Sequence, residues 1–186
     1  MSNLKMPLDY IKKQLRFNPR SFWNNLLATN CYAYALGIDI PEEQIANKAY
    51  IPGIMGSIVF NIQSSKLNKM SLEEKLYLDL RALDISHSEC SQSDISTNYF
   101  DGDFIIYQWI IAIFIDDNED FHFMRKSWDN DWWHKRGFNL EKPINYDDDF
   151  RTIYNPEKCN IDNSYKNAKY VKCLKLKYKR KEEFLH

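Results

Sequence analysis

The sequence predicts an α+β domain in which helices come first along the chain and an antiparallel sheet follows. Ser71 and Glu74 form a capping-box pattern ahead of leucines at helical spacing, which predicts a helix over residues 71–83. The apolar run FIIYQWIIAIFI at 104–115 predicts a buried strand. Alternating residues at 168–179 predict a last strand near the C-terminus. Helical signals therefore precede strand signals.

Size and composition favour one domain that spans residues 1–186. Of the 186 residues, 44% are hydrophobic and 15% aromatic, which is enough apolar surface for one sizeable core. The 25 basic and 26 acidic side chains nearly cancel. Because the chain has no strong net charge, we expect no nucleic-acid partner. We expect no membrane association either, since the longest apolar run is shorter than the roughly 20 residues that cross a bilayer.

The N-terminal segment and the cysteines indicate the cellular compartment in which we expect the protein. Residues 1–17 lack a basic start, an apolar run and a cleavage site, so we expect a cytoplasmic protein, or an effector delivered without a signal peptide. The four cysteines include no CxxC pair. Reduced thiols are the expectation, a Cys159–Cys173 bridge remaining open, and neither a metal nor a cofactor is expected.

The N-terminal part shows further helical segments. Leu8, Ile11 and Leu15 predict a helix after Pro7. Residues 41–50 predict another short helix, and 51–56 a tight loop whose two glycines let the backbone approach something, such as a substrate. Residues 87–98 are polar and serine-rich, which predicts a surface loop.

The C-terminal part predicts a meander of three strands. The run at 104–115 is followed by a turn at 116–119, a strand in DFHFMRKSW, a turn at 129–131 and a strand in WWHKRGF. The lysine-rich end of the last strand favours a protected sheet edge over a nucleic-acid patch.

Cys31 stands at the start of a predicted helix, with Asn30 as its N-cap and Gly37 as its stop. Unpaired backbone N–H groups at a helix start favour a thiolate, the nucleophilic form of cysteine. His122 lies in the middle of a predicted strand, which would aim its ring rigidly. We therefore expect Cys31 to be a nucleophile and His122 its base.

The blocks NCYAYALG, DFHFMR and WWHKRG together resemble the papain-like superfamily of cysteine hydrolases, in particular its NlpC-type branch. The resemblance implies a papain-like fold in which a nucleophile at a helix start packs on a C-terminal antiparallel sheet. It also implies a third polar residue about a dozen positions after the base, which points to His134. Cell-wall enzymes of this branch often have aspartate before the cysteine and serine-glycine after it. Asn30 and Tyr32 take those places, so the resemblance does not imply peptidoglycan as the substrate.

A register estimate leaves the third residue open. If the hairpin turns at 129–131, Trp128 pairs near Trp132 and His134 stands opposite Lys126. His134 would then be about 13 Å from His122, beyond hydrogen-bond reach, unless the hairpin has a bulge or another register. The alternative orienting residues are Asn139, Asn145 and the acidic run Asp147, Asp148 and Asp149.

Other residues are expected to contact the substrate or its oxyanion. The backbone N–H of Cys31 is a natural oxyanion donor, and Asn24 and Asn25 are candidate side-chain donors, as the resemblance implies. The further candidates are Asn30, Tyr32, Gly53 in the glycine loop, and Trp133 on the hairpin. The hairpin tryptophans could instead pack against a helix.

The resemblance implies a thiol-dependent hydrolase, a cysteine peptidase or amidase that cleaves a peptide or protein substrate through a Cys31 acyl-enzyme. Deamidation or transglutamination would use the same machinery. A non-catalytic binding module or inhibitor on the same fold is the alternative from another class. The sequence does not indicate an oligomeric state.

Overall fold

The structure is a computed structural model that describes residues 30–38, 51–116, 120–127, 130–136 and 142–181. The helices expected at 7–17 and 41–50 lie outside the described residues, as do Asn24, Asn25 and Asn139. The described part is α+β, with helices and one six-stranded antiparallel sheet.

The sheet has the strand order β1-β6-β3-β4-β5, and β2 pairs with β3 beside this path. The strands are β1 (Ser86–Cys90), β2 (Thr97–Asp101), β3 (Phe104–Ile115), β4 (Phe121–Lys126), β5 (Trp132–His134) and β6 (Lys169–Lys181). The expected meander is confirmed as β3-β4-β5. The expected last strand is confirmed as β6, which pairs with β3 on the side opposite β4.

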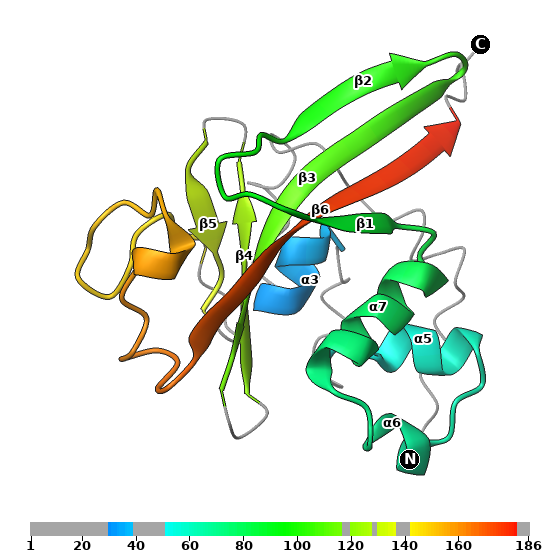
Figure 1. The fold of residues 1–186 in the computed structure, drawn as a ribbon, viewed down its shortest axis with the longest axis horizontal. Helices are drawn as coiled ribbons and strands as arrows, with labels where there is room; N and C mark the ends of the chain where they lie inside the picture. Colours follow the sequence, from blue (N-terminus) through cyan, green and yellow to red (C-terminus); the bar gives the residue numbers. More distant parts are fainter. Residues whose placement is uncertain (1–29, 39–50, 117–119, 128–129, 137–141, 182–186) are drawn as a thin grey trace.

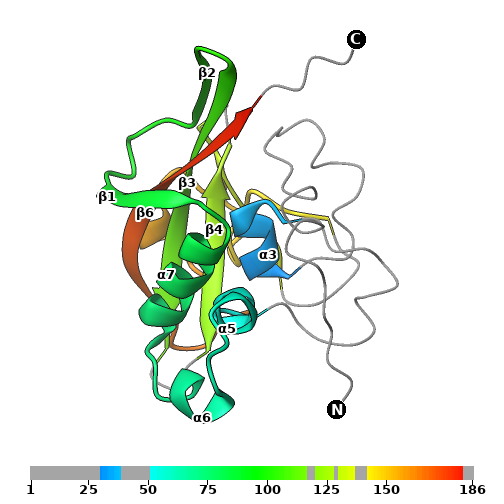
Figure 2. The same cartoon turned by 90° about the vertical axis from the view of Figure 1, so that its right-hand side faces the viewer.

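Helices cover one face of the sheet. They are α3 (Cys31–Leu36), α5 (Ile54–Val59), α6 (Ser64–Leu67) and α7 (Leu72–Ala82). Figures 1 and 2 show α5, α6 and α7 grouped together, with α3 beside β4. Their core includes Leu76 and Leu80 from α7 and Ile111, Ile113 and Phe123 from the sheet.

The predicted helix at 71–83 is confirmed. The Ser71 side chain accepts from the backbone N–H of Glu74, and the Glu74 carboxylate accepts from the N–H of Ser71. The stripe of leucines faces the core because their spacing matches the helical repeat, and Leu76, Leu80 and Leu83 are fully buried.

A second core lies on the opposite face, under the segment that follows β5. It includes Ile110, Ala112, Phe114, Met124 and Trp132. The covering segment contains the 3-10 helix Pro156–Lys158, and Figure 1 shows it, in yellow to orange, beside β5 and away from α7. Both faces of β3 and β4 are therefore buried, which explains the continuous apolar run at 104–115.

Two expectations for loops were wrong. The polar segment 87–98 contributes β1 and the first residues of β2 rather than one loop. These strands lie at sheet edges with mostly exposed side chains, so they show no apolar alternation. The expected loop at 51–56 already begins α5 at Ile54.

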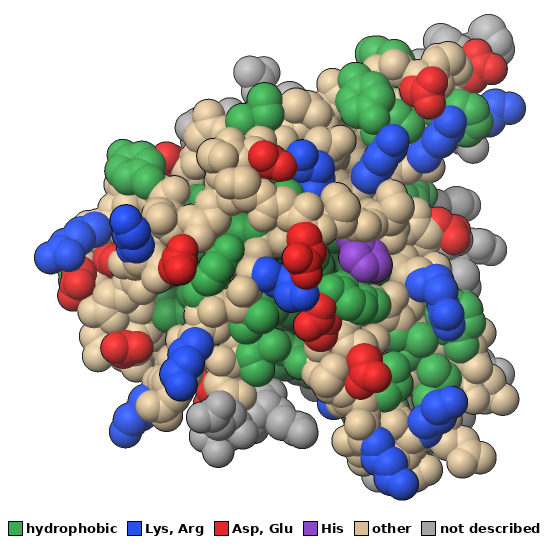
Figure 3. Space-filling view, in the orientation of Figure 1, with side chains coloured by type: hydrophobic (Ala, Val, Ile, Leu, Met, Phe, Trp, Pro, Cys, Tyr) green, Lys and Arg blue, Asp and Glu red, His purple; other side chains and the backbone are tan. Residues whose placement is uncertain are grey.

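The outer face of β6 carries lysines. Lys177, Lys179 and Lys181 alternate along the strand and are exposed. Figure 3 shows basic side chains gathered with hydrophobic and acidic ones where β2, β3 and β6 project from the body. Lys179 pairs with Asp101 at 3.2 Å, so part of this charge is neutralised within the sheet.

Candidate active site

Cys31 is the first residue of α3, as the sequence predicts. Asn30 is the N-cap, and its side-chain oxygen accepts from the N–H of Ala33 at 2.9 Å. Gly37 ends the helix in the left-handed conformation at φ 74°, which glycine adopts without a Cβ penalty. Every residue of α3 is buried, so this short helix is held by the core that surrounds it.

The thiol of Cys31 is directed at the backbone of β4. Its Sγ lies 4.0 Å from the carbonyl oxygen of Phe121, and the N–H of Phe123 also points to the sulfur. Strand N–H and C=O groups lie in the plane of a sheet. The sulfur therefore lies beside the edge of β4. Side chains on the two faces of this strand point into two different cores.

Burial keeps this thiol protonated. Desolvation raises the pKa of Cys31 to about 12, against the smaller lowering effect of the Phe123 N–H. We expected a helix start to lower the pKa, and the structure shows the reverse. The side chain is 4% exposed, so the loss of hydration outweighs the few N–H groups of a six-residue helix.

His122 occupies the opposite side of β4 from its two phenylalanine neighbours. The rings of Phe121 and Phe123 pack against Tyr32 of α3. The ring of His122 stacks on Tyr165, with centroids 3.9 Å apart. Successive strand side chains point to opposite faces, so the expected alternation is observed. His122 thus faces the second core, and Cys31 meets β4 at its edge.

His134 is the residue that contacts His122. The Nε2 atom of His122 and the Nδ1 atom of His134 lie 2.8 Å apart. The register with Trp128 near Trp132 was wrong: Lys126 pairs with Trp132, and Met124 pairs with His134. This register moves His134 two positions closer to His122 along β4, within reach of a diagonal contact.

The far nitrogen of His134 fixes the protons on both rings. Its Nε2 lies 3.0 Å from the carbonyl oxygen of Tyr146, and a carbonyl can only accept. His134 therefore donates from Nε2, and in a neutral ring its Nδ1 accepts. His122 must then donate from Nε2, which leaves its Nδ1 with a bare lone pair.

Both rings are held neutral. His122 and His134 are fully buried. Desolvation lowers the pKa of His122 well below its usual value, and repulsion by Arg136, and by His134 whenever that ring is protonated, lowers it further. Burial also lowers the pKa of His134 to about 4. Among the described residues the Nδ1 atom of His122 has no hydrogen-bond partner, so neither Cys31 nor another described group is bonded to it.

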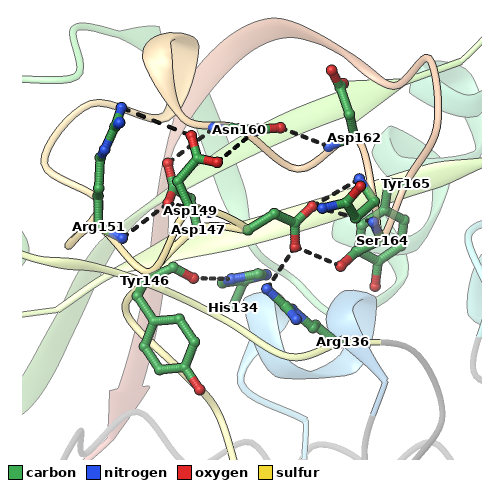
Figure 4. A network of polar contacts seen from close by, with 12 residues as sticks. His134, Arg136, Tyr146, Asp147, Asp149, Arg151, Asn160, Asp162, Ser164 and Tyr165 are labelled. Carbon is green, nitrogen blue, oxygen red and sulfur yellow. Dashed lines mark hydrogen bonds and ion pairs between the residues drawn. The ribbon is translucent and has the colours of Figure 1, made fainter.

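The alternative orienting residues make other contacts, as Figure 4 shows in part. Asn145 donates to the Asp131 carboxylate at 3.1 Å. The Asp147 carboxylate accepts from backbone N–H groups of its own loop, and Asp148 pairs with Arg136 at 2.6 Å. Asp149 lies 3.8 Å from Arg151. The structure brings none of these side chains to His122.

Tyr32 and Gly53 meet at a residue that the sequence did not reveal. Asp79 of α7 is fully buried, and its carboxylate accepts from the Tyr32 hydroxyl, the Gly53 N–H and the Gly56 N–H at 2.8, 2.8 and 2.7 Å. The glycine backbone does approach a partner, which is this carboxylate. An aspartate inside a leucine stripe was the available signal.

The remaining candidates are distributed around the hairpin and α3. Trp133 is half-buried opposite Arg125, on the face that carries α3. The side-chain oxygen of Asn30 is engaged in capping. The backbone N–H of Cys31 belongs to the first turn of α3, where N–H groups have no partner within the helix.

The described residues hold no disulfide and no cluster of three or more metal-ligating side chains. Cys31, Cys90, Cys159 and Cys173 are all free thiols. A hollow of about 800 Å³ beside Lys126 and another of about 720 Å³ beside Tyr77 and His87 are lined by neither Cys31 nor His122. No helix in the described part has the length and apolarity to span a membrane.

Comparison of the chain with models of protein families, with curated proteins and with solved structures gave no match. The assignment of a function therefore depends on the geometry of Cys31, His122 and His134.

Proposed function

We propose that this chain is a cysteine-dependent hydrolase that cleaves an amide bond of a peptide or protein substrate through a Cys31 acyl-enzyme. His122 acts as the base and His134 orients it. The observation that carries the proposal is the pair of contacts that fixes the tautomer of His122: its Nε2 lies 2.8 Å from His134 Nδ1, and His134 Nε2 lies 3.0 Å from the Tyr146 carbonyl. A ring whose Nε2 donates to His134 presents a bare Nδ1, which is the atom that can accept a proton.

The unpartnered nitrogen supports a functional role for the ring. A buried polar atom without a hydrogen bond costs about 1–3 kcal/mol. Within the described residues His122 Nδ1 is such an atom, although two hydrogen bonds hold the His122–His134 pair in place. Trp132 Nε1 and Arg136 Nε are also buried without a hydrogen bond in the described part, but both carry a proton, whereas His122 Nδ1 has a lone pair. This difference is the reason we propose proton transfer at His122.

In the proposed reaction the thiol leaves the Phe121 carbonyl, and its proton passes to His122 Nδ1. The thiolate attacks the substrate carbonyl carbon, and the resulting oxyanion accepts a hydrogen bond from the backbone N–H of Cys31. The C–N bond then breaks, and His122 returns the proton to the leaving amine. His122 then takes a proton from a water molecule, which attacks the thioester and releases the acid product. The departing thiolate takes this proton back from His122, which regenerates the thiol.

The resting thiol is separate from its base in this scheme. Its acceptor at rest is the carbonyl of Phe121, the residue next to His122, so under the proposal the thiol must leave this carbonyl before its proton can reach His122. Because the thiol is neutral at rest, the proton transfer accompanies substrate binding rather than preceding it. An attacking amine in place of water would give transfer, and a glutamine side chain as substrate would give deamidation.

A non-catalytic binding module is the second candidate, and the burial of Cys31 favours it. A thiol that is 4% exposed with a pKa raised to about 12 has the properties of a small core residue. The two candidates differ in whether a small electrophile reaches Cys31 with help from His122.

Site-resolved alkylation tests the proposal. The full chain is treated with a small vinyl sulfone between pH 6 and 9, and each of the four cysteines is quantified by peptide mass spectrometry. Under the proposal, Cys31 reacts about tenfold or more faster than Cys90, Cys159 and Cys173, since general-base help contributes on the order of 10²–10⁴. His122→Asn lowers that rate to the level of the other cysteines.

His87→Asn is the matched control, because His87 is an exposed histidine that stacks on Tyr77 away from Cys31. It should leave the Cys31 rate unchanged. A Cys31 rate no higher than that of the other cysteines, or one that His122→Asn does not alter, would establish the non-catalytic reading instead.

A further inference from the structure

We propose that Asp147 is a positioning residue that sets the tautomer of the His122–His134 pair through the carbonyl of Tyr146. This inference rests on the proposed function for its catalytic meaning, but its geometry is independent of that function. Asp147 touches neither histidine. It acts on the loop whose backbone oxygen decides where the ring protons lie (Figure 4).

The Asp147 carboxylate ties together three backbone positions. Its Oδ1 accepts from the N–H groups of Asp149 and Arg151, both at 3.0 Å, and its Oδ2 accepts from the N–H of Asn160 at 3.1 Å. Asp147 is buried, and these N–H groups lower its pKa although burial alone would raise it. The group is therefore an anion that accepts bonds from two separate parts of the segment after β5.

The main chain around Asp147 is held in the same way. The Asp147 N–H donates to the Arg151 carbonyl at 3.0 Å, and the Asp148 N–H donates to the Asn160 carbonyl at 2.8 Å. Tyr146 forms an isolated bridge with Thr152. The peptide that joins Tyr146 to Asp147 thus has little freedom to rotate, and its carbonyl oxygen stays on His134 Nε2.

The direction of the proton relay follows from this one carbonyl. An acceptor at His134 Nε2 requires a proton there, which makes His134 Nδ1 an acceptor and His122 Nε2 a donor. If the Tyr146 peptide turned away, His134 could carry its proton on Nδ1. His122 would then have to accept at Nε2 and carry its own proton on Nδ1, which would remove the base from the proposed reaction.

Nitrogen NMR of histidine-labelled protein reads this directly. Ring ¹⁵N shifts separate protonated from bare nitrogens, and the four histidines are assigned with single His→Asn variants. In the unaltered chain we expect His122 and His134 both protonated at Nε2. In Asp147→Ala the protonated-Nδ1 population of His134 should rise by about fivefold or more, since the loss of about 1 kcal/mol of preference corresponds to that factor. His122 should follow in the same direction.

Asp149→Ala is the matched control in the same loop, because the Asp149 side chain is 42% exposed. The substitution removes the ion pair with Arg151 and the bond that the Asn160 side chain donates at 3.2 Å, but none of the backbone bonds to the Asp147 carboxylate. It should leave both tautomers unchanged. If Asp147→Ala does not fold, Asp147→Asn decides, since it keeps one acceptor oxygen and loses the bond to Asn160. Unchanged tautomers in a folded Asp147 variant, or an equal shift in Asp149→Ala, overturn the inference.

The two proposals fail in different ways. The NMR readout needs no reaction, so a tautomer shift in Asp147→Ala stands even if alkylation shows Cys31 to be inert. If Cys31 is reactive and the inference is correct, Asp147→Ala also slows alkylation of Cys31 at pH 7, by the same fraction by which NMR shows the reactive tautomer of His122 to decrease. A reactive Cys31 with unchanged tautomers would retain the hydrolase and remove the role of Asp147.

Discussion

The hydroxyl of Tyr32 donates a 2.8 Å hydrogen bond to the carboxylate of Asp79, which lies 47 positions later in the chain. Tyr32 directly follows Cys31, so α7 holds the helix that carries the candidate nucleophile. The same carboxylate accepts from Gly53 and Gly56 before and within α5. One buried anion therefore joins three helices on the face of the sheet that carries α3.

Asp79 should make stability fall as pH rises. Burial raises its pKa to about 6 from 3.8, because desolvation outweighs the hydrogen bonds that it accepts. Between pH 3.8 and 6 the folded chain holds a proton that the unfolded chain has lost, so this contribution is largest below pH 3.8 and decreases up to pH 6. Urea unfolding of the wild type and Asp79→Asn from pH 4 to 7.5 measures it. The free energy of unfolding that Asp79→Asn loses relative to the wild type should be larger at pH 4 than at pH 7.5. A loss that does not change with pH would contradict the prediction.

The histidine pair should act in the opposite direction. The pKa of His134 is lowered to about 4 from 6.5, and that of His122 is lowered as well. Below pH 6.5 the unfolded chain binds protons that the folded one excludes, so stability is complete above 6.5 and decreases towards 4. For His134 the loss is about 3 kcal/mol at 1.36 kcal/mol per pKa unit.

Comparing the unfolding free energies of the wild type and His122→Gln/His134→Gln at pH 7 and 5 isolates this effect, because the contribution of Asp79 cancels. The double variant should lose less stability than the wild type on acidification. Equal losses would mean that the rings are not neutral in the folded state.

Gly56 should not tolerate a side chain. A Cβ there would lie 2.2 Å from Cγ of Leu78 and 2.8 Å from its backbone. Because backbone cannot move aside cheaply, Gly56→Ala should lower the free energy of unfolding by about 3 kcal/mol or more. Gly102→Ala is the control, because a Cβ at this position would meet nothing within 4 Å. Its only cost is the strain of an alanine at a φ of 59°, about 1 kcal/mol of unfolding free energy. If Gly56→Ala and Gly102→Ala unfold at the same denaturant concentration, the clash at Gly56 is refuted.

Ser71 should stabilise α7 through its cap. Its side chain and that of Glu74 satisfy one backbone N–H each. Ser71→Ala should cost about 1 kcal/mol, and Ser71→Asp should restore most of it because aspartate caps equally well. Ser88→Ala, on the exposed strand β1, should cost almost nothing. Thermal denaturation should give the lowest midpoint for Ser71→Ala, a higher one for Ser71→Asp and the highest for Ser88→Ala.

Local patterns were the most informative part of the sequence. The cap at Ser71, the helix start at Asn30, the stop at Gly37 and the long strand at 104–115 depend on neighbouring residues, and each was predicted. The pairing of His122 with His134 came from a family resemblance and not from register counting. The counted register placed these histidines too far apart, because it began pairing at Trp128 and not at Lys126.

Other features depend on contacts between distant residues. Nothing near Asp79 in the sequence indicates that Tyr32 and two glycines would surround it. The polarity of β1 reflects its place at an exposed edge, which only the pairing with β6 reveals. The high pKa of Cys31 depends on how deeply α3 is buried, and a helix-start pattern does not contain that information.

The position of β6 between β1 and β3 also bears on synthesis of the protein. Ser86 bonds to Lys177, 91 residues later, so β1 leaves the ribosome long before β6, its neighbour in the sheet, has been synthesised. Until β6 arrives, one edge of the apolar strand β3 is uncovered in the nascent chain, and such edges invite pairing with other chains. Completion of the sheet thus joins segments that are distant in the chain, and such non-local pairing favours slow folding.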